Sequence, residues 1–192
     1  MNIYELAISR RSIRRFKQIA VPYEILEKCV NAARLAPSAA NLQPLEYIIV
    51  DDEQLLDKVF HTLLTWAASL GSQGVPPMGS RPKVYIVILK NKNLAIPFSV
   101  QDVGLAVENM ILVALEEGIG SCCLGSADQG KLAAVLNVPD DYEIALVLAL
   151  GYPDESPVEE PFDGSTKYWK DDYGVLHVPK KSLDKILHRN AF

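Results

Sequence analysis

The segment FSVQDVGLAVENMILVALEE, residues 98–117, decides how this chain can be arranged, because it is the longest helical pattern in the sequence. Its apolar residues recur at helical spacing and form one face, made of Val100, Val103, Gly104, Val107, Met110, Ile111, Ala114 and Leu115. Several further apolar residues lie off this face, which predicts a helix buried nearly all round, in a domain core or at a subunit interface. Gly118 and Gly120 follow the pattern and predict its end.

The segments around this helix supply elements that could cover it. Runs of β-branched and apolar residues predict strands at Leu45–Val50, Val84–Leu89 and Glu143–Leu150. The last run is continuous and apolar, so we expect it at the centre of a sheet. Helical patterns with start or stop signals cover residues 2–10 capped by Asn2, the segment from Pro22 to before Pro37, residues 53–68, and residues 128–137 capped by Asp128.

The sequence from Gly151 onward differs from the rest of the chain. It is polar and rich in proline, with a short extended segment at Val175–Val178 and a helical pattern that begins at Ser182. Such a segment cannot form a core of its own, so we expect it to pack on this domain or on a partner subunit.

Composition excludes several classes of protein. The length of 192 residues and the 49% share of hydrophobic residues predict a single folded domain with a sizeable core. The formal net charge of −5 argues against general nucleic-acid binding. No apolar run approaches the roughly 20 residues that cross a bilayer, and the N-terminus becomes charged too early for a signal peptide. Cys29, Cys122 and Cys123 have no metal-ligand spacing. We therefore expect a reduced cytoplasmic protein with no metal, nucleic-acid or membrane partner.

The arginine segment, RRSIRRF at residues 10–16, places four arginines within six positions of an acidic chain. Cations near the end of a helix can simply complement its dipole. One or two arginines would suffice for that purpose, whereas four with Ser12 among them favour an anion site. Guanidinium groups and a hydroxyl are suited to a phosphate dianion.

The carboxamide loop, APSAANLQP at residues 36–44, combines small residues with Asn41 and Gln43. Small residues allow close approach to a flat ligand, and carboxamides donate and accept hydrogen bonds. Taken alone, the loop would be interpreted first as an ordinary turn that ends a helix.

Two further segments have ordinary structural interpretations that need no function. The segment GIGSCCLG, residues 118–125, is rich in glycine but lacks the spacing of either nucleotide-binding motif. Its vicinal cysteines could suggest redox chemistry, although we favour small buried residues in a strand. Lys180 and Lys181 are, by themselves, a solvated charge pair.

No arrangement of a nucleophile with a base is legible in the sequence. His61, His177 and His188 stand outside any Ser/His/Asp or Cys/His pattern, and no dense carboxylate pair is present. We therefore expect no catalytic side chain, and an enzyme of this kind would leave the difficult step to a cofactor.

Taken in order, these motifs resemble the FMN-dependent nitroreductase family. The resemblance rests on the arginine segment, the carboxamide loop, the helix from Gln101 to the glycines at 118–120, and the segment Leu150–Pro153. The ending, from Tyr168 to Leu183, is similar to a short bacterial or archaeal branch. The resemblance implies an α+β, three-layer α-β-α fold with a mixed, largely antiparallel central sheet, in a domain-intertwined homodimer. Residues 1–153 would form the FMN-binding core, and residues 154–192 a C-terminal extension on the partner subunit.

The resemblance also implies which residues bind FMN. Arg10 and Ser12 would hold the phosphate and ribityl end, with Arg11 contributing, and Lys180 or Lys181 would complete the clamp. Arg14 would approach N1 and O2 of the flavin and tune its potential. Arg15 has no implied role, so we expect a plain surface charge. The opposite subunit would line the ring with Pro37, Ser38, Ala39, Asn41 and Gln43. Leu124 and Gly125 would lie over the flavin, with the Gly125 amide near N5.

The implied activity is that of an NAD(P)H oxidoreductase with ping-pong kinetics. NADH or NADPH would deliver hydride to flavin N5, and a nitroaromatic, quinone or similar small acceptor would then be reduced. Reductive dehalogenation and flavin fragmentation are alternatives on the same fold. Outside enzymes, the alternatives are a flavin-binding or sensing module without turnover and a phosphate-binding regulator without flavin.

Overall fold

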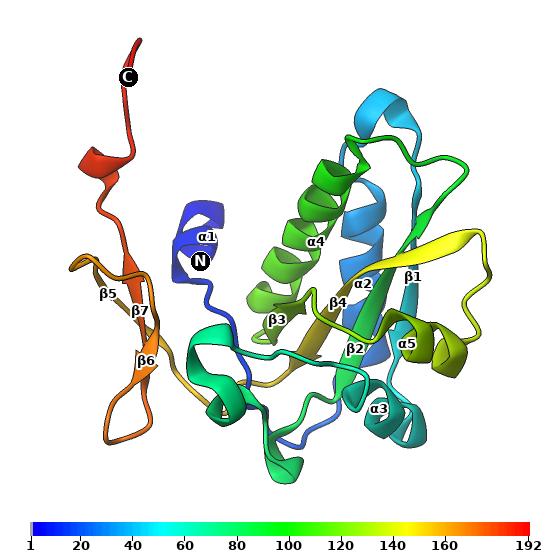
Figure 1. Ribbon diagram of the computed structural model, residues 1–192, viewed down its shortest axis with the longest axis horizontal. Helices are drawn as coiled ribbons and strands as arrows, with labels where there is room; N and C mark the ends of the chain where they lie inside the picture. Colours follow the sequence, from blue (N-terminus) through cyan, green and yellow to red (C-terminus); the bar gives the residue numbers. More distant parts are fainter. Residues whose placement is uncertain (1) are drawn as a thin grey trace.

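The protein is described by a computed structural model that covers residues 2–192 (Figure 1). Its main sheet has the strand order β1-β2-β4-β3, with β1 at Leu45–Val50, β2 at Val84–Asn91, β3 at Gly120–Leu124 and β4 at Tyr142–Gly151. Each neighbouring pair is antiparallel. A single parallel bridge between Ser12 and Ser121 continues the sheet beyond β3. The sheet is therefore largely antiparallel, and the apolar run in β4 is central, as its sequence predicts.

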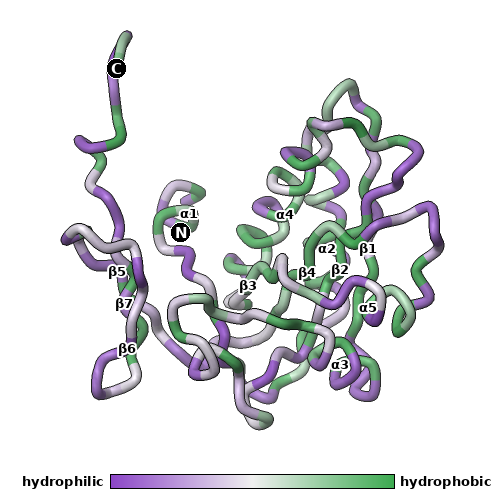
Figure 2. Tube along the Cα trace, viewed as in Figure 1, coloured by the Kyte–Doolittle hydropathy of each residue, from purple (hydrophilic) through white to green (hydrophobic). Residues whose placement is uncertain are grey.

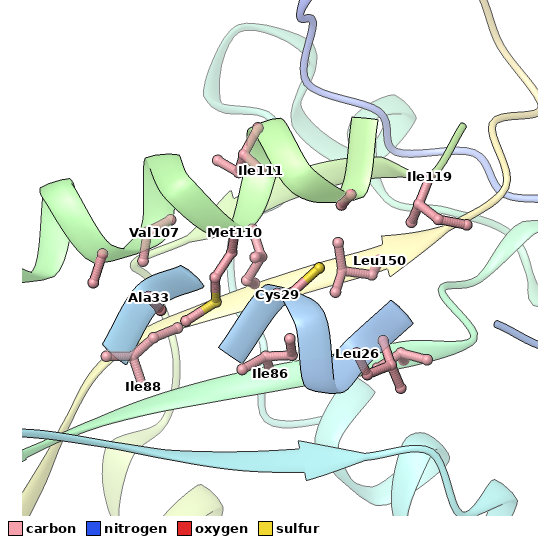
Figure 3. Close-up of a cluster of buried hydrophobic side chains, with 14 of the residues drawn as sticks. Leu26, Cys29, Ala33, Ile86, Ile88, Val107, Met110, Ile111, Ile119 and Leu150 are labelled. Carbon is pink, nitrogen blue, oxygen red and sulfur yellow. The ribbon is translucent and has the colours of Figure 1, made fainter. Parts of the chain in front are cut away.

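Helices cover both faces of this sheet, which confirms the three-layer α+β fold. Alternation along β2 explains why, since Val84, Ile86 and Ile88 face one core while the residues between them face the other. The first core is closed by α2 (Tyr23–Arg34) and α4 (Ser99–Glu116), and Figure 3 shows their side chains meeting those of β2 and β4. The second is closed by α3 (Glu53–Phe60) and α5 (Gln129–Leu136).

Burial of α4 is less complete within one chain than its sequence predicts. Met110 and Ala114 are fully buried against the sheet. On its other side, however, Val100 is 67% exposed and Leu105 is 48% exposed. Phe98, which precedes the helix, is 65% exposed. An apolar surface therefore remains along the first half of α4, and exposed apolar surface of this kind is typical of interaction sites.

The helix predicted over residues 53–68 is wrong beyond Phe60. The chain leaves α3 and pairs with the segment before α5, through a bridge between Leu63 and Ala127. The Leu64 amide donates to the Ser126 carbonyl at 2.9 Å, and the Asp128 amide donates to Thr62 at 2.8 Å. This long-range pairing replaces the helical hydrogen bonds and buries Leu63 and Trp66 in the second core.

The C-terminal arm, residues 154–192, forms a small sheet of its own beside α1 (Ile3–Ser9) (Figure 1). Its strand order is β5-β7-β6, with β5 at Val158–Pro161, β6 at Trp169–Lys170 and β7 at Leu176–Lys180. Where the sequence predicts a helix from Ser182, the chain makes a single 3₁₀ turn at Leu183–Lys185. Figure 2 shows the apolar stretches concentrated on the helices and strands of the main body, while the arm is more mixed.

Helix caps agree closely with the sequence. The side chain of Asn2 accepts from the Glu5 amide at 3.0 Å, and the Glu5 carboxylate accepts in turn from the Asn2 amide at 3.0 Å. Asp128 likewise accepts from Lys131 at the start of α5. Among residues 2–192, no helix has both the length and the apolar character that crossing a bilayer requires.

Candidate functional site

A cavity of about 710 Å³ lies between the arginine segment and the C-terminal arm. Its lining includes six of the predicted site residues, namely Arg10, Arg11, Ser12, Arg14, Lys180 and Lys181. Five of these are cations, and the lining contains only one carboxylate, that of Glu159. The volume is typical of a cofactor-sized pocket. The structure thus brings together, within one chain, the residues predicted to surround a phosphate.

The arginine segment owes its shape to its two apolar residues. Ile13 and Phe16 are buried, and the Ile13 amide donates to the Ser121 carbonyl at 2.8 Å, so the segment lies along β3. Glycines make this close approach possible. A Cβ at Gly120 would lie 2.7 Å from Cγ1 of Ile13, and one at Gly151 would lie 2.9 Å from Cδ1 of Phe16. Because Ile13 and Phe16 fix the backbone, the polar residues between them are presented outward.

The helix-end interpretation of the arginines is correct for Arg11. Arg11 donates to the Ile8 carbonyl at 2.8 Å, so it does satisfy the end of α1. The same guanidinium contacts Glu159 at 2.7 Å across the cavity. Arg10 lies 3.7 Å from Glu108 of α4. The arginines are therefore held by carboxylates that leave them exposed to the cavity.

Arg14 and Arg15 have different environments. The Nε of Arg14 donates to the Trp66 carbonyl at 2.7 Å, and its guanidinium lies 5.5 Å from the centre of the Tyr168 ring. Arg15 instead donates to the Gln73 carbonyl at 2.8 Å. Burial lowers the pKa of Arg15, while the nearby Glu155 opposes that shift. The expectation of a plain surface charge at Arg15 is therefore wrong, because this side chain donates a hydrogen bond to the loop before β2.

The carboxamide loop lies at the other end of α4. Ala40, Asn41 and Gln43 have φ of 51°, 55° and 49°, a region that residues other than glycine rarely adopt. The Ala39 amide donates to Oδ1 of Asp102 at 2.9 Å, and the Gln43 amide donates to Oγ of Ser38 at 3.1 Å. Pro37, Ser38 and Gln43 line a separate cavity of about 150 Å³ together with Asp102. The loop residues are thus not brought to the arginine cavity within one chain.

Leu124 and Gly125 lie at and just beyond the end of β3. Leu124 is 2% exposed and packs into the second core, whereas Gly125 is exposed. Neither residue lines the arginine cavity or the smaller cavity.

The adjacent cysteines of β3 have unlike environments. Cys123 is exposed, while Cys122 is buried next to Arg14. Burial raises the pKa of the Cys122 thiol, which disfavours the reactive thiolate. Within residues 2–192, no group of three or more His, Cys, Asp or Glu side chains is arranged to hold a metal ion.

Sequence reasoning missed the acidic residues of the site. Asp102 was signalled weakly, as a lone acid in the first turn of a helix otherwise buried in the core. Glu155 and Glu159 gave no signal, because they meet the arginine segment only after the arm folds back across about 140 residues of sequence.

Comparisons with known proteins are consistent with this arrangement. The profile of the Nitroreductase family matches residues 7–152. A protein of Archaeoglobus fulgidus, named "Putative NADH dehydrogenase/NAD(P)H nitroreductase", is 34% identical over 164 residues, which cover 83% of this chain and 90% of the relative. The iodotyrosine deiodinase of Thermotoga neapolitana is 28% identical over 174 residues, covering 83% of this chain and 92% of that protein.

The fold is also shared with solved structures. An FMN-dependent nitroreductase from Clostridium difficile superimposes with a TM-score of 0.70 and 26% identity, covering 97% of this chain and 98% of that one. The family profile spans most of the chain, and a relative above 30% identity covers most of it as well. The chain therefore belongs to the nitroreductase family.

Proposed function

We propose that this protein is an FMN-dependent oxidoreductase that uses NADH or NADPH to reduce a small electron acceptor. The observation that carries the proposal is the 710 Å³ cavity, in which Arg10, Arg11, Ser12 and the two arm lysines face one space. These donors fit a phosphate dianion, because guanidinium, ammonium and hydroxyl groups all donate to its oxygens.

The residues divide into two roles in this proposal. Arg10, Ser12 and one or both of Lys180 and Lys181 would hold the phosphate, with Arg11 turned toward it from the end of α1. Arg14, at the inner part of the same cavity, would place its charge beside the flavin ring. When bound, FMN would supply the hydride-accepting atom N5, which no side chain of this chain can replace.

The separation between the two parts of the predicted site supports a homodimer. The carboxamide loop is bonded to the first turn of α4, while the arginine segment lies along β3, which follows the last turn. The 18 residues of α4 span about 27 Å. Figure 1 shows these two regions at opposite ends of that helix. The two regions line separate cavities within one chain, and a second subunit that supplied its loop to the cavity of the first would bring both to one FMN.

Exposed apolar residues supply surfaces for such an interface. Ile3 and Tyr4 of α1 are 66% and 70% exposed, and Val100 of α4 is 67% exposed. In the arm, Leu183 and Leu187 are 68% and 64% exposed. Pairing of two subunits along α1 and α4 would bury the residues of those helices, and packing of the arm on a partner subunit would bury Leu183 and Leu187.

Reductive dehalogenation is the second candidate. It is favoured by the deiodinase of T. neapolitana, whose match covers 83% of this chain. A flavin-binding module without turnover is the alternative outside enzymes.

The test is a purified sample under anaerobic conditions. We expect a yellow protein with about one FMN per chain, bleached by NADH or NADPH and reoxidised by a nitroaromatic or a quinone. Reoxidation by a halogenated phenol in preference to these acceptors would favour the second candidate. A yellow protein that neither nicotinamide bleaches would favour the module, and a colourless protein that takes up no added FMN would refute the proposal.

A further inference from the structure

Asp102 is a buried acid without an assigned role. It is 4% exposed, at the first turn of α4, where it faces the carboxamide loop. Its Oδ1 accepts the Ala39 amide at 2.9 Å, and its Oδ2 is buried without a hydrogen-bond partner among residues 2–192. A buried carboxylate oxygen without a donor is costly to a fold. Such a residue is not explained by stability alone.

The loop that Asp102 contacts is strained. Ala40, Asn41 and Gln43 all lie in the left-handed region, and Ala40 is alanine, which has no side-chain hydrogen bond to offset the strain. Strained residues of this kind persist only where the surroundings hold them, and they concentrate at functional sites. In the described part of the chain, two side chains bond the amides of this loop, Asp102 at Ala39 and Ser38 at Gln43. Asp102 is the only one of the two that lies outside the loop.

We propose that Asp102 is the positioning residue of the flavin-binding loop, which it holds in the left-handed conformation that presents Ser38, Asn41 and Gln43 to the flavin. The inference rests on the proposed function, because it assigns the loop to FMN. Asp102 itself does not touch the flavin. It acts through the Ala39 amide, which anchors the loop to the first turn of α4.

Ser99 provides a matched control three residues earlier in the same helix. Its side chain is fully buried, and its Oγ accepts the Ile96 amide at 3.1 Å. Ser99→Ala therefore removes a side-chain bond to backbone at the start of α4, as Asp102→Ala does. It differs in that the released segment precedes α4 and is not the carboxamide loop.

The experiment compares FMN dissociation constants, measured by flavin fluorescence on the refolded full-length chain. We expect Asp102→Ala to raise the constant at least tenfold, and Asp102→Asn, which keeps an oxygen for the Ala39 amide, to stay within threefold of wild type. Ser99→Ala should lower thermal stability without changing the constant. Adding Ala40→Gly to Asp102→Ala should restore part of the affinity, because glycine adopts the left-handed region without strain.

Three outcomes would overturn the inference: an unchanged dissociation constant in Asp102→Ala, an equal weakening in Ser99→Ala, or a dissociation constant in Asp102→Asn as high as in Asp102→Ala. Hydrogen exchange at the Ala39 amide gives a readout that does not require FMN. We expect the exchange to accelerate in Asp102→Ala alone. A wild-type protein that binds no FMN would refute the proposed function, whereas unaltered exchange at Ala39 in Asp102→Ala would refute the role of Asp102.

Discussion

The arginine segment and the carboxamide loop are built on opposite principles. The arginine segment is an extended backbone held by two buried apolar residues, with its charges supplied by side chains. The loop is a strained backbone held by one buried acid, with exposed carboxamides at Asn41 and Gln43. An ordinary strand edge is enough to present charges, whereas the proposed contact with the flat flavin ring falls to a backbone forced out of its preferred conformation.

The largest expected effect comes from Gly120→Val. Its side chain would meet Ile13 and Pro153 below 3 Å and lift the arginine segment off β3. We expect FMN affinity to fall roughly a hundredfold and stability to fall by about 1–3 kcal/mol. Gly79→Ala, where an added Cβ meets nothing within 4 Å, is the control for chemical denaturation and FMN titration. Normal FMN binding by Gly120→Val would mean that the segment does not hold the phosphate.

Arg14→Ala should change the flavin rather than the fold. If Arg14 lies beside the ring, removing its charge destabilises negative charge there, and the two-electron midpoint potential should fall by roughly 30 mV for each 1.4 kcal/mol lost. Arg15→Ala is the control, because Arg15 contacts the Gln73 carbonyl instead. Spectroelectrochemistry should show a lower potential for the first variant and a wild-type potential for the second. Equal potentials in both variants would remove Arg14 from the ring.

Glu159→Gln should have a smaller effect on FMN affinity, in the direction opposite to that of Gly120→Val. Glu159 is the only carboxylate in the lining of the arginine cavity and contacts Arg11 at 2.7 Å. Removing its charge should tighten FMN binding by about threefold, since exposed ion pairs are worth less than about 1 kcal/mol. Glu24→Gln, an exposed change on α2, should have no effect. Weaker FMN binding by Glu159→Gln would show that the carboxylate helps the site.

The smallest expected effect is a loss of stability of the C-terminal arm at low pH. Burial acts to raise the pKa of Asp171, but hydrogen bonds from the Val175 and Tyr173 amides and from His177 outweigh it, so its pKa lies below the ordinary value. Because the pKa is lowered on folding, the Asp171 carboxylate stabilises the folded arm at pH values above its unfolded pKa of about 3.9. This contribution is lost as the pH falls through the lower pKa of the folded arm. Tryptophan fluorescence should report a change near Trp169 below about pH 4, in the arm that carries the lysines and not in the carboxamide loop. The change should disappear in Asp171→Asn and persist in Asp163→Asn.

Much of the fold and half of the site follow from local sequence patterns. The apolar runs in β2 and β4 and the caps at Asn2 and Asp128 are local signals, and each predicts its element. The end of α3 is not predictable in this way, because a strand-like pairing with residues 126–128 replaces helical bonds there.

The limits on the site have the same physical origin. The arginine segment can be recognised from its composition alone. Asp102 and Glu159, in contrast, act through contacts with residues 63 and 148 positions away. Long-range contacts of this kind depend on the folded topology and leave little trace in a single sequence.

Subunit complementation determines whether each FMN contacts the arginine segment of one chain and the carboxamide loop of the other. Gly120→Val breaks the first part, and Asp102→Ala breaks the second. Chains of the two variants, unfolded together and refolded as a mixture, should recover about a quarter of the wild-type FMN sites, because half of randomly paired dimers would carry one intact site of two. With FMN held no higher than the wild-type dissociation constant, each variant refolded alone should bind only a small fraction of the wild-type FMN. A mixture that binds no more FMN than the separate variants would contradict the claim.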